Sequence, residues 1–120
     1  MKFSVILVAL LSLPNSVDAA EVINARLNLA TQAIDVDVRY GGGCKDHKFS
    51  LQFGACLESY PVRCEAKLVD STKDDFCEAL ISTTASFSLK EYGLTDSYYQ
   101  GATITISGDN STRAFVILPR

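Results

Sequence analysis

Four cysteines, Cys44, Cys56, Cys64 and Cys77, lie close together in a chain of 120 residues. The chain opens with an almost unbroken apolar run, Phe3 to Leu13, which is typical of a secretory signal. Exported cysteines tend to oxidise, and disulfides stabilise small domains whose cores are limited. The cysteines therefore predict a small extracytoplasmic domain held together by disulfides, and they argue against thiol chemistry.

The start of the chain predicts a cleaved signal peptide and no membrane anchor in the mature chain. The apolar run ends at Pro14 and is about half the length of the roughly 20 apolar residues that a membrane helix needs. Small residues favour cleavage after Ala19, with Ala20 as the alternative. The expected organisation is a signal peptide over residues 1–19 and a single domain over residues 20–120. The expected location is secreted or periplasmic.

Apolar residues alternate with polar ones along most of the mature chain, and this period of two predicts β-strands. The clearest run places Ile34, Val36 and Val38 between charged residues. The predicted strands cover residues 22–28, 34–38, 49–53, 62–68, 83–89, 103–106 and 114–118. Short strands joined by turn sequences predict an all-β fold, an immunoglobulin-like antiparallel β-sandwich of about seven strands. A small β-barrel is the alternative.

The four cysteines allow three disulfide pairings. Cys56 and Cys64 flank the turn of one predicted hairpin, so their Cα atoms can lie within disulfide reach. The favoured pairing is therefore Cys56 with Cys64 and Cys44 with Cys77. Because Cys56 is out of phase with the apolar residues of its strand, this pairing requires a β-bulge, which we place at Gly54.

His47 is the only histidine, so a histidine-dependent enzyme would have to use it. Its spacing from Cys44 also allows a zinc site completed by the other cysteines. Disulfides would remove these thiolates, and we therefore predict a structural His47 that hydrogen-bonds a loop backbone. Neither a cofactor nor a metal is predicted, and the chain is not expected to be an enzyme.

Two further segments have structural interpretations. Asp70, Asp74, Asp75 and Glu78 crowd one loop, which predicts a solvated acidic loop, with weak calcium binding as the alternative. Three consecutive glycines at 41–43 predict a bulge, a sharp corner or a close approach of the backbone to another group.

Four tyrosines, Tyr60, Tyr92, Tyr98 and Tyr99, are the candidate binding residues. Tyrosines in loops supply rigid, amphipathic contact area at low entropic cost. The competing interpretation is that Tyr98 or Tyr99 forms a tyrosine corner, in which the hydroxyl ties a loop to the sandwich.

Two segments carry a family resemblance. The sequence GGCKDHKF at residues 42–49 and the sequence DFCEALI at residues 75–81 resemble small exported bacterial β proteins of the NigD-like and lipoprotein-like kind. The resemblance implies a bacterial envelope or secreted β-sandwich and implies no activity. It also fits a bridge between Cys44 and Cys77. Since the chain lacks a lipidation cysteine, a soluble product is expected.

The net charge of −3 argues against nucleic acid and against anionic membranes as partners. The first functional hypothesis is a non-enzymatic binding module for a protein or glycan, which uses the loop from Tyr92 to Tyr99 and the turn from Glu58 to Pro61. The second is a disulfide-braced inhibitor of a secreted enzyme that presents residues 57–62. The third is a metal protein or enzyme centred on His47.

Overall fold

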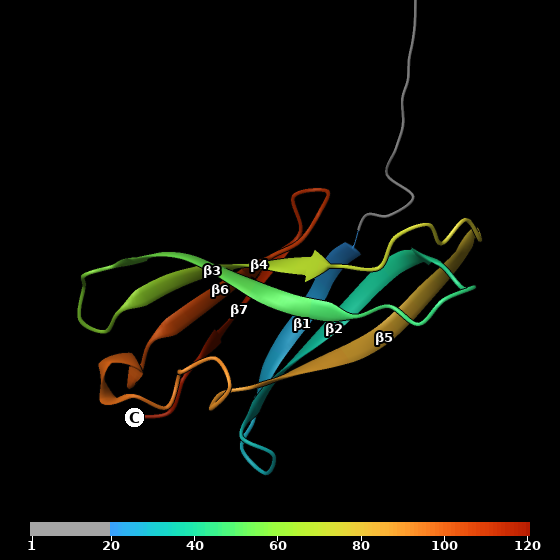
Figure 1. Ribbon diagram of the computed structural model, residues 1–120. Helices are drawn as coiled ribbons and strands as arrows, with labels where there is room; N and C mark the ends of the chain where they lie inside the picture. Colours follow the sequence, from blue (N-terminus) through green and yellow to red (C-terminus); the bar gives the residue numbers. More distant parts are fainter. Residues whose placement is uncertain (1–19) are drawn as a thin grey trace, which may run out of the picture.

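The computed structural model describes residues 20–120 (Figure 1). The predicted signal peptide lies outside these residues. The described chain forms the strands β1 (Ala20–Asn28), β2 (Ala33–Gly42), β3 (Phe49–Leu57), β4 (Arg63–Asp70), β5 (Ala79–Ser88), β6 (Thr103–Ser107) and β7 (Arg113–Ile117), with a short 3-10 helix, η3 (Ser97–Tyr99), before β6. No helix within this range is long and apolar enough to cross a membrane.

The strands form two sheets, with the orders β1-β2-β5 and β3-β4-β6-β7. This arrangement confirms the predicted all-β sandwich, and the sheets do not close into the alternative barrel. All paired strands are antiparallel except β4 and β6, which run parallel. Hairpin signals alone do not predict this parallel pair. It arises because β5 belongs to the other sheet, so the chain re-enters the larger sheet alongside β4 in the same direction.

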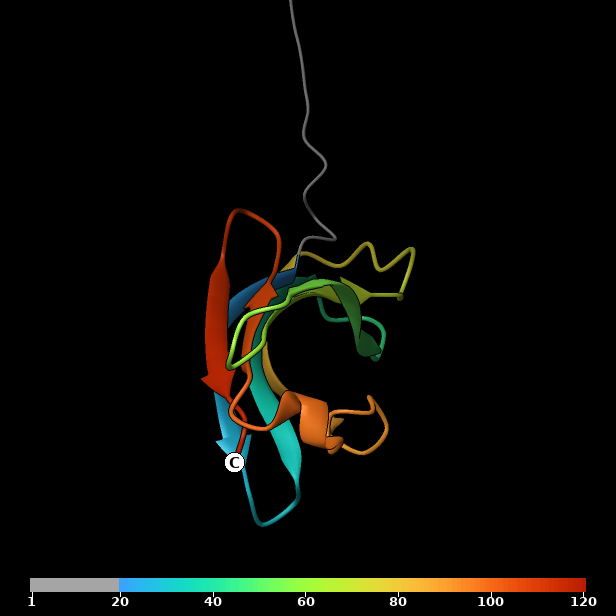
Figure 2. The same cartoon turned by 90° about the vertical axis from the view of Figure 1, so that its left-hand side faces the viewer.

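The alternating apolar residues form one core between the sheets. Ile34, Val36 and Val38 of β2 are buried and pack in the same cluster as Ile104 and Ile106 of β6. Burying each such side chain stabilises a fold by about 1.5–3 kcal/mol relative to leaving it exposed. In Figure 2 the strands of the two sheets together form a curved arc that is open on one side.

Local irregularities follow from particular residues. The β3–β4 register shifts between Phe53 and Cys56, which confirms the bulge predicted around Gly54. The segment from Ser88 to Leu94 forms hydrogen-bonded turns that end at Gly93, whose φ of 71° is left-handed.

Candidate functional site

Both predicted disulfides are present, with the favoured pairing. Cys56 and Cys64 are directly opposed in the β3–β4 hairpin, with Cα atoms 4.1 Å apart. Cys44 and Cys77 connect the segments that precede β3 and β5, and their Cα atoms are 5.7 Å apart. The sulfurs of all four cysteines are paired, and sulfurs in disulfides are not the thiolate ligands that the alternative zinc site would need. Disulfides also indicate an oxidising, non-cytoplasmic compartment.

His47 lies between two buried carboxylates. Its Nδ1 is 2.5 Å from Asp70 Oδ2, and its Nε2 is 2.7 Å from Asp75 Oδ2. Only 1% of the His47 side chain is exposed, and the two aspartate side chains are 5% and 1% exposed. The predicted structural role fits this geometry, but the predicted partner was wrong: His47 bonds two side chains and not a loop backbone. A carboxylate is the stronger acceptor when the imidazole is charged.

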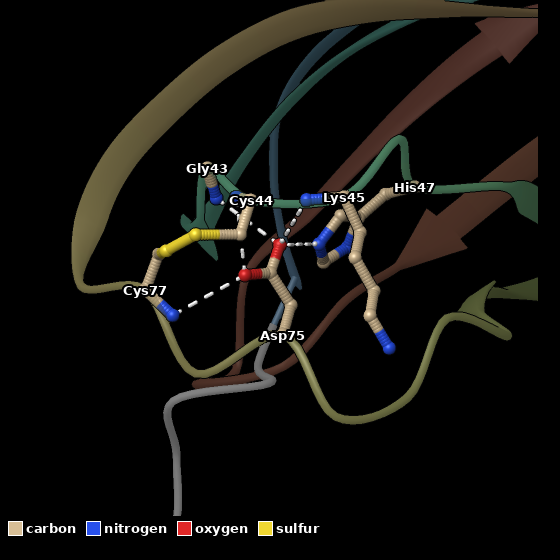
Figure 3. The surroundings of a disulfide bond; sticks show 6 residues. All are labelled: Gly43, Cys44, Lys45, His47, Asp75 and Cys77. Atoms are coloured by element: carbon tan, nitrogen blue, oxygen red, sulfur yellow. Dashed lines mark hydrogen bonds and ion pairs between the residues drawn. A yellow bond between two sulfur atoms is a disulfide. The ribbon is translucent and has the colours of Figure 1, made fainter.

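Asp75 is the centre of this cluster (Figure 3). Its Oδ2 accepts hydrogen bonds from the backbone N–H groups of Gly43 and Lys45, at 3.1 and 3.2 Å. Its Oδ1 accepts from the backbone N–H groups of Cys44 and Cys77, at 3.2 and 3.3 Å. The expectation of a solvated acidic loop was therefore wrong for Asp70 and Asp75, whose side chains are buried. For Asp75, these backbone donors replace water.

Gly42 confirms the predicted close approach of the glycine segment. A Cβ atom at this position would lie 2.5 Å from Asp75 Oδ2 and 2.9 Å from His47 Nε2. Every residue other than glycine would thus displace the carboxylate or the imidazole.

The charges in the cluster stabilise one another. Burial by itself lowers the pKa of His47, but the hydrogen bonds and charges of Asp70 and Asp75 outweigh it, so the pKa of His47 is raised. The hydrogen bond from His47 is the largest influence on Asp75, and with the backbone N–H donors it holds the pKa of Asp75 well below its usual range, against the opposing effect of burial. The cluster therefore favours the protonated form of the His47 imidazole.

Aromatic rings close the cluster on one side. The Tyr40 ring lies with its centroid 4.2 Å from the His47 ring and 5.5 Å from the Phe49 ring. Burial, followed by the charges of nearby aspartates, raises the pKa of the Tyr40 hydroxyl. Both nitrogens of His47 are already bonded, whereas a general acid or base must reach a substrate proton. The arrangement fits a structural tie between the β2–β3 connection, the end of β4 and the β4–β5 connection.

Analysis of the sequence missed Asp70, Asp75 and Tyr40 as partners of His47. The sequence did contain one indication of the contact between Asp75 and His47. The predicted bridge between Cys44 and Cys77 places the residues that follow the first cysteine beside those that precede the second. That proximity points to Asp75 opposite His47.

The structure separates the four candidate tyrosines. Tyr92 packs against Phe53 and Phe87, and its hydroxyl accepts a hydrogen bond from the Leu51 backbone N–H at 3.1 Å. Tyr92 therefore anchors its loop to β3, the role that the sequence suggested for Tyr98 or Tyr99. Tyr99 packs partly against the core.

Tyr60 and Tyr98 lie at the surface. Tyr60 is 92% exposed in the β3–β4 turn. The hydroxyl of the exposed Tyr98 donates to Glu58 Oε2 at 2.9 Å, which brings the loop containing η3 against the same turn. The structure thus brings together the two segments that were predicted to share a surface.

The outer face of the larger sheet adds an exposed apolar surface that the sequence analysis did not identify. Leu57, Phe115 and Ile117 are 64%, 61% and 58% exposed, and we call them the outer apolar patch. Leu57 and Ile117 lie in one cross-strand row, joined through Arg63 and Thr103. A shallow hollow of about 690 Å³ lies between Leu57 and Phe115. The sequence feature that indicates this surface is the unbroken apolar run at residues 114–118, which makes both faces of β7 apolar.

Comparison with protein-family models, with curated proteins and with solved structures gave no match. The resemblance to NigD-like proteins stays a prediction.

Proposed function

We propose that the protein is an exported, non-enzymatic binding module that recognises a protein partner through the outer apolar patch. The observation that carries this proposal is the exposure of Leu57, Phe115 and Ile117 on one sheet face beside a hollow. Phe115 and Ile117 are neighbours on one face of β7, and Leu57 lies on the same sheet face across Arg63 and Thr103. Exposed apolar residues with a polar rim are typical of protein contact sites. Arg63 and Glu65 supply charged groups at this surface.

The adjoining end of the sandwich extends the surface. Tyr60 and Tyr98 lie at the turn that begins directly after Leu57. Rigid tyrosines next to an apolar patch favour a protein over a glycan as the partner, because the patch needs an apolar counterpart. A sandwich with its contact surface on one sheet and at one end fits an immunoglobulin-like class. Export by a cleaved signal peptide is supported by the two disulfides.

The test is capture of partners from extracellular or periplasmic extracts, with identification by mass spectrometry. The variant Phe115→Thr/Ile117→Thr keeps β-branched residues in the strand but removes the apolar surface, and we expect it to lose the partner that the wild-type protein captures. Leu29→Thr, which changes an exposed leucine in the β1–β2 turn, is the matched control. Equal capture of the partner by the wild-type protein and the double variant would contradict the proposal.

A second candidate is an inhibitor of a secreted enzyme. It is favoured by the exposure of Tyr60, 92%, on a turn that is braced by the Cys56–Cys64 disulfide. The Ser59 hydroxyl donates to the Pro61 carbonyl at 2.8 Å and further orders this turn. An ordered loop loses little conformational entropy when it enters an active site. If an inhibited enzyme is found, Tyr60→Ala should weaken inhibition while Phe115→Thr/Ile117→Thr should not.

A further inference from the structure

Within residues 20–120, no strand pairs with the outer edge of β5, and this edge lacks the usual protection. The strand β5 is an outermost strand of its sheet, and its ten residues, Ala79–Ser88, include neither a charged residue nor proline. Its pairing with β2 runs without a bulge. Natural edge strands are usually blunted by charges, prolines or bulges, because their free N–H and C=O groups pair readily with another strand. The edge strand β3, by contrast, contains the bulge near Gly54.

A hollow of about 400 Å³ runs along this edge. On the β5 side it is lined by five consecutive residues, Thr83 to Phe87. Successive strand residues point to opposite faces, so a hollow that touches all five lies against the edge itself and not on one face. Its other wall is formed by Tyr40, Asp46, His47 and Phe49. We call it the edge hollow.

We propose that the β5 edge binds an extended segment of a partner protein, which adds as a fourth strand to the β1-β2-β5 sheet. In this mode, backbone hydrogen bonds supply affinity and alternate side chains supply specificity. Side chains of the added strand that point inward would enter the edge hollow against the aromatic rings of Tyr40, Phe49 and Phe87. Apolar residues at every second position of the segment would meet these rings, and polar groups make up the rest of the wall.

The charges near the edge decide between a foreign segment and a second copy of the chain. Asp46 lines the hollow, and Asp35 and Asp37 of β2 bond the hydroxyls of Ser86 and Thr84, at 2.6 and 2.8 Å. Asp37 also pairs with Arg26, whereas Asp35 accepts from a neutral amide, that of Asn28. The surroundings are therefore acidic. A second copy would bring the same acids together, whereas an uncharged or basic segment complements them.

The test uses a displayed library of random peptides of the same length as β5, selected on the full exported protein. We expect enriched peptides that alternate apolar residues with neutral or basic ones. Hydrogen exchange on the complex with a selected synthetic peptide should show new protection in residues 79–88. Thr83→Arg, which places a bulky cation in the edge hollow, should weaken binding by about tenfold or more. The matched control is Ser82→Arg, on the same strand but outside the hollow, and it should change affinity by less than about twofold.

Several results would overturn the proposal: no enriched peptide, enrichment of acidic peptides, protection elsewhere than β5, or equal loss of binding in both variants. Concentration-dependent dimerisation that protects residues 79–88 would instead assign the edge to a second copy, and the proposal would be wrong. The outcome is independent of the outer apolar patch, since Phe115→Thr/Ile117→Thr should bind the selected peptides as wild type does.

Discussion

The single histidine of this protein lies in a buried cluster with two carboxylates. His47, when protonated, pairs with two carboxylates that are buried with it, Asp70 and Asp75. Burying a charge is costly unless it is paired and hydrogen-bonded, and here each ring nitrogen meets one carboxylate. His47 therefore connects the segment before β3 to the end of β4 and to the β4–β5 connection.

Replacing the histidine tests this interpretation. We expect His47→Ala to lower the free energy of unfolding by about 3–5 kcal/mol, because removing one partner of a buried pair leaves the other charges uncompensated. Urea unfolding followed by circular dichroism measures the change. Asp46→Ala, which alters the exposed residue next to it, should cost less than about 0.5 kcal/mol. A loss in His47→Ala no larger than in Asp46→Ala would contradict the structural role.

At the scale of elements, the two disulfides serve different parts of the sandwich. Cys56–Cys64 closes a hairpin with a sequence separation of 8, whereas Cys44–Cys77 closes a separation of 33 and lies beside Asp75. In the chain-entropy model, a disulfide stabilises more when it closes a longer loop. The longer bridge also holds the backbone N–H groups that Asp75 needs.

We therefore expect Cys44→Ala/Cys77→Ala to be the more damaging pair of substitutions. Loop entropy alone predicts a loss of about 3–4 kcal/mol for this pair and about 2–3 kcal/mol for Cys56→Ala/Cys64→Ala. Denaturant titration of the two double variants makes the comparison. Equal losses, or a larger loss from the hairpin pair, would contradict the assignment of Asp75 and its N–H donors to the longer bridge.

At the scale of the whole molecule, the buried imidazolium makes global stability depend on pH. The raised pKa of His47 means that its contribution is fully present below the unfolded value of about 6.5 and is lost as pH rises through the folded value. The lowered pKa of Asp75 acts in the opposite direction, since its contribution is lost as pH falls below about 4. The protein should be most stable in mildly acidic solution.

Unfolding measured across this range provides the check. Between about pH 6.5 and the folded pKa of His47, stability should fall by up to about 1.4 kcal/mol per pH unit. His47→Gln should remove this slope, because the chain contains no other histidine. A wild-type stability that rises with pH above about 6.5, or an unchanged slope in His47→Gln, would show that His47 is neutral in the folded state.

The sequence by itself determined the strands, the bulge near Gly54 and the disulfide pairing. These features depend on local patterns: alternation with a period of two sets which side chains are buried, and a hairpin brings its own cysteines together. Cys44 and Cys77 are the two cysteines that remain, so their pairing then followed by elimination. The parallel β4–β6 pair, the exposed face around Phe115 and the acidic partners of His47 did not follow.

Only the tertiary structure decided those features, because they depend on how distant segments meet. Asp70 and Asp75 are 23 and 28 residues from His47, and no local period relates them. Likewise, the apolar run of β7 does not reveal which of its residues face the core until the partner sheet is in place. Tyr92 anchors its loop through a hydroxyl that reaches β3 only in the folded sandwich. Local sequence patterns determine where the strands form. The packing of the two sheets determines which residues are buried, paired or left exposed for a partner.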